Sequence, residues 1–136
     1  HFTGLIALDI GGNQVEEIPN AIFNMKNLEI LNISSNMEIK HLPDSLVDLK
    51  KLNDLNISFT QIEELPPGFN QMTHLSKLDI SSIKIEGIPT EVLTLTQLTN
   101  LSMGSLKISE IPVEISCFKN IKYLDLGNNH INIVPT

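Results

Sequence analysis

Residues 5–19 read LIALDIGGNQVEEIP, and this arrangement of apolar residues ending in an apolar–Pro pair returns along the whole chain. The six pairs are Ile18-Pro19, Leu42-Pro43, Leu65-Pro66, Ile88-Pro89, Ile111-Pro112 and Val134-Pro135. Successive prolines are 24, 23, 23, 23 and 23 residues apart. A period as regular as this one is typical of a stack of near-identical structural units. The sequence therefore predicts a repeat protein, whose function depends on a surface.

The composition narrows the class of protein and of partner. The chain has 136 residues, is 41% hydrophobic, and contains no apolar run of the roughly 18–20 residues that a membrane span needs. Its net charge is −7, and all nine basic residues are lysines. Because nucleic-acid and anionic membrane surfaces attract positive charge, we expect neither as a partner. The single cysteine, Cys117, allows no internal disulfide, which favours a reducing, cytoplasmic location.

Each repeat combines two periodicities. The first half alternates apolar and polar residues, as in Leu78-Asp79-Ile80, and predicts a strand. After the Pro, apolar residues such as Leu46 and Leu49 recur every third position, which predicts a short helix or 3₁₀ turn. One long helix is excluded, because an internal Pro costs about 3 kcal/mol. A single strand-plus-helix unit cannot bury its apolar side, so the units must stack around a shared core.

The full pattern L-x-x-L-x-L-x-x-N-x-I-x-x-I-P resembles the leucine-rich repeat, and the 23-residue length is similar to the intracellular Ras-suppressor and Ras-scaffold type. The resemblance implies an α/β fold. It would be a right-handed solenoid with a parallel β-sheet on the concave face and short helices or 3₁₀ turns on the convex face. It also implies protein binding. The Asn position departs from the pattern: Asn13, Asn36 and Asn129 keep it, Thr60 substitutes in part, and Ile83 and Leu106 cannot form hydrogen bonds. We therefore expect the fourth and fifth repeats to be looser.

We expect a single domain over residues 1–136, with repeats at about 5–27, 28–51, 52–74, 75–97, 98–120 and 121–136. Both ends fall inside repeats, and Phe2 matches the last core position of an earlier repeat. This predicts a fragment of a longer solenoid. Its uncovered ends, with Phe2 and Leu5 at one and Ile131 and Val134 at the other, could stack on each other in end-to-end self-association.

Outward-pointing strand residues should form columns across the concave face. Because concave faces are the usual binding surfaces of solenoids, we predict a partner-binding surface there. The candidate residues are Asp9, Asn32, Asp54, Asn56, Phe59, Lys77, Asp79, Asn100, Tyr123 and Asp125. A merely solvated polar sheet is the alternative, and for Phe59 the alternative is a side chain folded onto its own repeat. The acidic bias predicts a partner with a basic patch and salt-sensitive association.

Nothing in the sequence predicts catalysis, a metal or a cofactor. The glycines of Gly11-Gly12-Asn13 lack the Lys and the spacing of a phosphate loop, and the four histidines lie far apart. The glutamates on one flank are interpreted as a solvated edge: Glu16, Glu17, Glu63, Glu64, Glu86 and Glu110. Three N-x-S triplets, at Asn32, Asn56 and Asn100, would accept glycans only in a secretory compartment.

The leading hypothesis is a non-catalytic protein–protein interaction module, a cytoplasmic scaffold in signalling. One alternative is the regulatory arm of a larger GTPase, kinase or cyclase. Another is an extracellular receptor or adhesion domain, or a secreted effector, which the three N-x-S triplets keep open.

Overall fold

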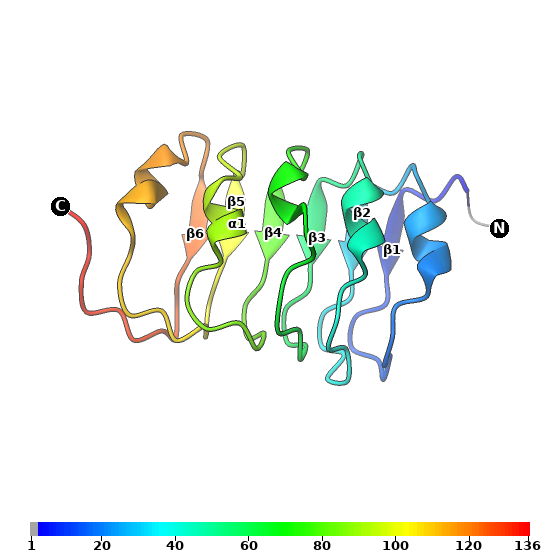
Figure 1. Ribbon diagram of the computed structural model, residues 1–136, viewed down its shortest axis with the longest axis horizontal. Coiled ribbons are helices and arrows are strands. Elements are labelled where there is room, and N and C mark those ends of the chain that lie inside the picture. The colour runs from blue at the N-terminus through cyan, green and yellow to red at the C-terminus, as the bar shows by residue number, and fades with distance from the viewer. Residues whose placement is uncertain (1–2) are drawn as a thin grey trace.

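The computed structural model describes residues 3–136 and shows one coil of chain after another, stacked side by side (Figure 1). Each coil contributes one strand to a single parallel sheet in the order β1-β2-β3-β4-β5-β6. The strands are β1 Ala7–Asp9, β2 Ile30–Asn32, β3 Asp54–Asn56, β4 Lys77–Asp79, β5 Asn100–Ser102 and β6 Tyr123–Asp125. This confirms the predicted α/β solenoid. We number the coils one to six after their strands.

Short helices cover one side of the sheet. Four are 3₁₀ helices, namely η1 Asn20–Asn24, η2 Asp44–Asp48, η3 Phe69–Gln71 and η4 Val113–Cys117, and the fourth coil has the α-helix α1 Thr90–Leu93. In η1, η2, α1 and η4 a proline in extended conformation precedes the first residue. Its carbonyl accepts the first bond, as Pro43 does from Leu46 N–H at 3.0 Å. Proline therefore starts each of these helices at the predicted place.

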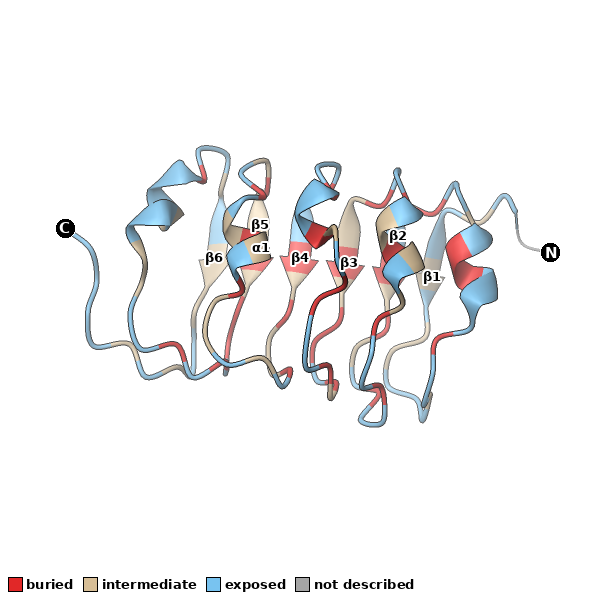
Figure 2. Cartoon of the chain, viewed as in Figure 1, coloured by how far each residue is buried: buried red, intermediate tan, exposed pale blue. Residues whose placement is uncertain are grey.

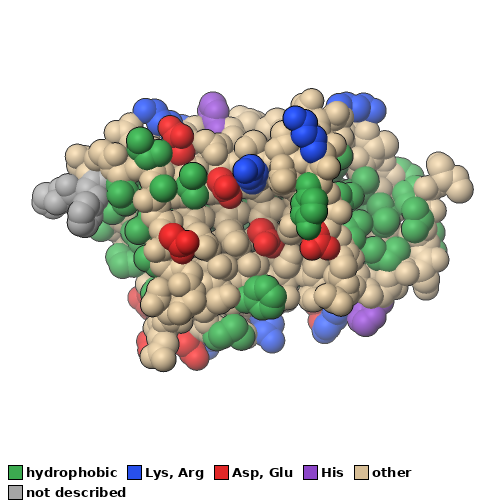
Figure 3. All heavy atoms as spheres, turned by 180° about the vertical axis from the view of Figure 1, so that it is seen from behind, with side chains coloured by type: hydrophobic (Ala, Val, Ile, Leu, Met, Phe, Trp, Pro, Cys, Tyr) green, Lys and Arg blue, Asp and Glu red, His purple; other side chains and the backbone are tan. Residues whose placement is uncertain are grey.

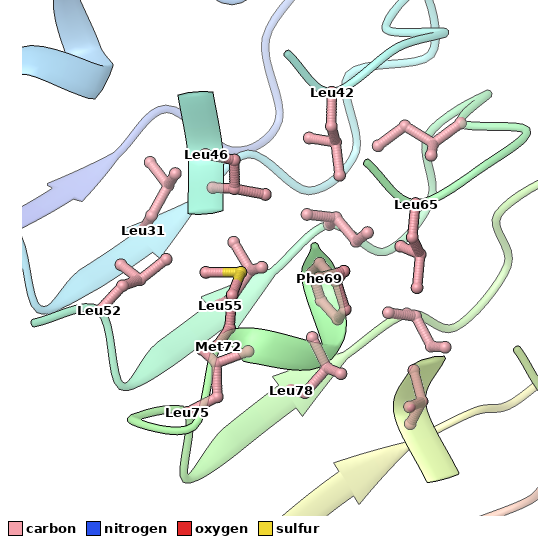
Figure 4. Packing of buried hydrophobic residues seen from close by; sticks show 14 of the residues in the cluster. Leu31, Leu42, Leu46, Leu52, Leu55, Leu65, Phe69, Met72, Leu75 and Leu78 are labelled. Atoms are coloured by element: carbon pink, nitrogen blue, oxygen red, sulfur yellow. The ribbon is translucent and has the colours of Figure 1, made fainter. Parts of the chain in front are cut away.

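The core is a thin, continuous layer between sheet and helices (Figures 2 and 4). The central strand residues pair in register from Leu8 to Leu124, and those of coils two to five are at most 2% exposed. Helix residues such as Leu46, Phe69 and Val92 meet them from the other side. Phe23 of η1 is also buried, although the repeat pattern assigned the core positions to its neighbours Ile22 and Met25.

The extra residue of the second coil does not disturb the sheet. Leu31 pairs with Leu55 although they are 24 residues apart, and Leu55 pairs with Leu78 at the regular spacing. The insertion is absorbed beyond the strand, where Met37 is 55% exposed. The coil therefore keeps its stacking and places one additional apolar side chain in solvent.

Two of the three asparagines that keep the predicted position, Asn36 and Asn129, connect neighbouring coils. The amide oxygen of Asn36 accepts from Val15 N–H (3.0 Å), and its NH₂ group donates to the carbonyls of Ile10 (3.0 Å) and Ile33 (2.9 Å). Asn129 makes the same kind of bonds to the fifth coil, accepting from Leu106 N–H at 2.9 Å. Thr60 bonds only within its own coil, to the Ile57 carbonyl.

Ile83 and Leu106, which replace this Asn in coils four and five, turn inward and are 6% and 1% exposed. Apolar packing therefore stands where the other coils have an amide. The looser structure expected for these two coils stays a prediction.

Candidate binding surface

The face of the sheet opposite the helices has no covering layer in the described chain (Figures 1 and 3). Parallel sheets are normally covered on both faces, since both are usually apolar. Here the outward face carries polar side chains mixed with exposed apolar ones, including Ile30 and Tyr123, which are 42% and 53% exposed. We call this surface the concave face.

Strand pairing brings the predicted columns together. The first column contains the first residue of each strand: Ala7, Ile30, Asp54, Lys77, Asn100 and Tyr123. The second contains the third residue of each strand: Asp9, Asn32, Asn56, Asp79, Ser102 and Asp125. Nine of the ten candidate residues therefore lie in two adjacent columns. Their role in binding stays a prediction.

The second column also has a structural role that the sequence analysis missed. The side-chain oxygen of Asp79 accepts from the backbone N–H of Ser81 at 2.9 Å, and Asp125 does the same with Gly127 at 2.8 Å. The side-chain oxygens of Asp9, Asn32 and Asn56 likewise accept from the backbone N–H two residues later in the chain. Such Asx turns are a recognised local preference of Asp and Asn, so the i, i+2 spacing to Gly or Ser was an available signal. The bond fixes each side chain in place on the concave face.

The charge of the two columns is predominantly acidic. The second column contains Asp9, Asp79 and Asp125, separated by neutral polar residues, and Figure 3 shows acidic side chains spaced along the middle of this face. Asp54 adds a fourth carboxylate beside Lys77, its neighbour across the strand pair. With four aspartates and one lysine, the columns have a net charge of −3. They would attract a basic surface at a distance set by ionic strength.

Phe59, the tenth candidate, lies just beyond the strand in a turn. Every coil has one residue here in the left-handed backbone region: Gly12 (φ 69°), Ser35 (56°), Phe59 (54°), Ser82 (55°), Ser105 (57°) and Asn128 (55°). Phe59 is 52% exposed, as predicted. It lines a groove with Met37, which the sequence analysis did not select because it lies in the insertion.

The glutamate flank contains one ion pair. Glu86 bonds to Lys107 of the next coil, and both side chains are about two thirds exposed, at 69% and 66%. The hydrogen bond from Lys107, together with its positive charge, lowers the pKa of Glu86. Lys107 also lies in the left-handed backbone region (φ 56°), so the fifth coil has two such residues, Ser105 and Lys107. Among residues 3–136 this is the only salt bridge, in keeping with a mostly solvated edge.

The uncovered end of the first coil has an apolar hollow of about 460 Å³ lined mainly by Leu5, Leu8, Ile10, Val15, Ile22 and Met25. At the other end Ile133 and Val134 are 57% and 66% exposed. Phe2 lies outside the described residues. End-to-end self-association stays a prediction.

The described residues include no cluster of three or more His, Cys, Asp or Glu side chains suited to a metal ion. Cys117 is exposed. None of the helices described here is both long and apolar enough to cross a bilayer.

Comparison with known proteins defines the class. Residues 4–104 match the family described as "Leucine-rich repeat region", so the chain belongs to the leucine-rich repeat family, as its sequence pattern indicated. No curated protein sequence matches it significantly. The similarity to the Ras-suppressor type stays a prediction.

Several solved structures share the fold. The LRR protein LIC12759 of Leptospira interrogans is 34% identical, with a TM-score of 0.86 over 98% of this chain and 34% of that chain. Internalin C2 of Listeria monocytogenes is 25% identical, with a TM-score of 0.80 over 94% of this chain and 54% of that chain. The ectodomain of the receptor kinase GASSHO1/SCHENGEN3 of Arabidopsis thaliana, solved in complex with CASPARIAN STRIP INTEGRITY FACTOR 2, is 29% identical. Its TM-score is 0.79 over 93% of this chain and 16% of that chain. The chain thus spans about a third and about half of the first two proteins.

Proposed function

We propose that this chain is a non-catalytic interaction module that binds a protein partner with a basic patch through its concave face. The observation that carries the proposal is a parallel sheet with one bare face, on which four aspartates are held in two columns. A face that served stacking alone would be covered or uniformly polar. The complex of GASSHO1 with CASPARIAN STRIP INTEGRITY FACTOR 2 supports binding of a protein ligand by this fold.

The turn bonds of the second column allow a clean test. Asn32 and Asn56 make the same bond as the aspartates, so Asp→Asn substitutions remove charge and retain the turn. The variant combines Asp9→Asn, Asp79→Asn and Asp125→Asn. Charge reversal would be less informative, because a lysine at position 79 would also remove the acceptor of Ser81 N–H.

Wild-type protein and the triple variant would be used as baits for affinity capture at low and raised salt. We expect proteins that wild type captures at about 50 mM salt to be reduced at about 300 mM, where the Debye length roughly halves, and lost with the variant. The free energies of unfolding of the two baits should agree within about 0.5 kcal/mol. Identical capture by both baits would exclude the aspartate columns as the binding surface.

An extracellular recognition domain is a second candidate, favoured by the receptor-kinase ectodomain among the structural neighbours. The Asn of each N-x-S triplet lies on the concave face, so a glycan there would cover part of the proposed surface. Mass spectrometry of the natural protein before and after glycosidase treatment separates the two: a mass loss favours the extracellular candidate, and no change favours the cytoplasmic one.

A further inference from the structure

Four departures from the repeat meet in one place. The first is Met37, in the insertion of the second coil. The second is Phe59, in a turn where the other coils have Gly, Ser or Asn. The last two are the apolar Ile83 and Leu106, which occupy the Asn position of the repeat. All four line a single groove of about 340 Å³ beyond the carboxyl ends of strands β2 to β5. Regular positions in a solenoid serve stacking between coils. Ile83 and Leu106 are buried and pack in the core, whereas the exposed Met37 and Phe59 add nothing to stacking and therefore indicate another role.

Phe59 is unfavourable for the isolated fold in two ways. Its φ of 54° lies in the left-handed region, which bulky residues rarely adopt. Phe59 is also 52% exposed, so little apolar surface is buried in exchange for the strain. Asn128 occupies the same position in the sixth coil with φ 55° and without this penalty. An aromatic side chain in this turn is accounted for if it contacts a partner.

Met37 is the second exposed apolar residue that lines the groove. It is 55% exposed and comes from the coil next to that of Phe59. Methionine is flexible and polarisable, and aromatic residues are enriched among binding hot spots. Ile83 and Leu106 line the groove from coils four and five, and both are buried. Figure 3 shows exposed hydrophobic side chains gathered below the acidic ones, towards this edge of the sheet.

The rim of the groove differs in charge from the concave face. Lys84, Lys107 and Glu86 all line it. Within residues 3–136 the one salt bridge joins Lys107 to Glu86, so the exposed Lys84 is an unpaired cation. The groove therefore has a local charge of +1 beside columns of net charge −3, in a chain of net charge −7.

We propose that this groove binds an extended segment of the partner protein. An aromatic or long aliphatic side chain of that segment packs against Phe59 and Met37, and a carboxylate close to it in sequence pairs with Lys84. The volume is near the lower end of the roughly 300–1,000 Å³ typical of ligand pockets, which suits one or two side chains rather than a helix. The inference rests on the proposed function, since the groove borders the aspartate columns that would hold the partner's basic patch.

The test is selection of random peptides displayed on phage against the immobilised chain, followed by affinity measurement of the enriched peptides. Phe59→Asn removes the ring and installs the residue that the sixth coil has at this position. Val113→Asn is the control, because Val113 is also exposed, at 70%, but lies on η4, outside both the groove and the concave face. Lys84→Gln removes the unpaired charge.

We expect the enriched peptides to share an apolar residue with Asp or Glu within about three positions. Their affinity should fall about tenfold or more with Phe59→Asn, as for an interface hot spot, and by a smaller, salt-dependent factor with Lys84→Gln. Val113→Asn should leave it unchanged. The unfolding midpoint of Phe59→Asn should equal or exceed that of wild type, which separates loss of binding from loss of folding.

Absence of any enriched peptide, or equal affinity for wild type and Phe59→Asn, would overturn the proposal. A consensus without acidic residues would overturn the pairing with Lys84. Peptides that lose affinity for the triple Asp→Asn variant but not for Phe59→Asn would refute the groove and leave the concave-face proposal standing.

Discussion

Asn36 connects the first two coils, and its removal should reveal how much that connection stabilises the fold. The residue is completely buried. Its amide oxygen accepts from Val15 N–H, and its NH₂ group reaches the carbonyls of Ile10 and Ile33, all at 2.9–3.0 Å. Asn36→Ala removes these partners in a place from which water is excluded.

The magnitude follows from the groups left behind. Val15 N–H and the Ile33 carbonyl lose this partner, and an unsatisfied buried group costs about 1–3 kcal/mol. The Ile10 carbonyl still accepts from Asn13 at 2.9 Å, so its loss is smaller. We therefore expect Asn36→Ala to lower the free energy of unfolding by about 2–4 kcal/mol.

Asn13→Ala is the matched control. Asn13 has the same position in the first coil, but it is exposed and bonds only to carbonyls of its own coil, those of Ile10 and Gly11. Water can replace these bonds, so the expected cost is about 0.5 kcal/mol or less. Because the chain has no Trp and one Tyr, urea unfolding should be followed by far-UV circular dichroism. A difference below about 0.5 kcal/mol between the two variants would refute the argument that buried coil-to-coil bonds stabilise this solenoid.

Three further predictions concern the core, a turn and the ion pair. Leu55 is 0% exposed, so Leu55→Ala should lower the free energy of unfolding by about 2–5 kcal/mol, as measured in urea. Leu124 in β6 is only partly buried, so Leu124→Ala should lower it clearly less. Equal losses would contradict a core shared between coils. In the fifth coil Ser102 replaces the usual Asp or Asn, and the Ser81 hydroxyl accepts from Gly104 N–H instead, at 3.0 Å. Ser81→Ala should therefore lower the free energy of unfolding by about 0.5–1.5 kcal/mol, whereas Ser34→Ala should be near neutral. The lowered pKa of Glu86 means that its ion pair stabilises the fold at neutral pH and that this contribution is lost as the pH falls through that pKa, below the ordinary glutamate range. Carboxyl NMR titration should show this low pKa in wild type and its return towards the ordinary value in Lys107→Met; an unchanged value would exclude Lys107 as the cause.

The even period allowed the columns of the concave face to be predicted, because a constant spacing sets the register of every strand pair. Asp9 through Asp125, and Ala7 through Tyr123, align by their spacing in the chain, and the strand pairs follow that alignment. The period says nothing about backbone conformation between strands. The left-handed turn at Phe59 was therefore missed, since the aligned apolar positions do not include this turn and do not distinguish a Phe there from a small residue.

Met37 was missed for a related reason. An insertion removes a residue from the alignment, so the pattern assigns it no column and no neighbour. Phe23 was missed because the helical spacing of three pointed to Ile22 and Met25, whereas the turn of η1 also brings Phe23 inward. In each case local geometry within one coil decides the outcome, and the repeat carries no information about it.

The location of the strained turn in the stack is itself informative. A bulky residue in the left-handed region costs about 1–2 kcal/mol, which one coil alone could not offset. The third coil has a neighbour on both sides, and its residues Leu55, Ile57 and Phe69 are all 0% exposed. In a solenoid, stability is shared between adjacent coils, so a coil with a neighbour on both sides can retain a locally unfavourable turn. Coils one and six have Gly12 and Asn128 in this position, residues that adopt the conformation readily. The groove at Phe59 therefore lies where the stacked core can offset the local cost of an exposed aromatic side chain.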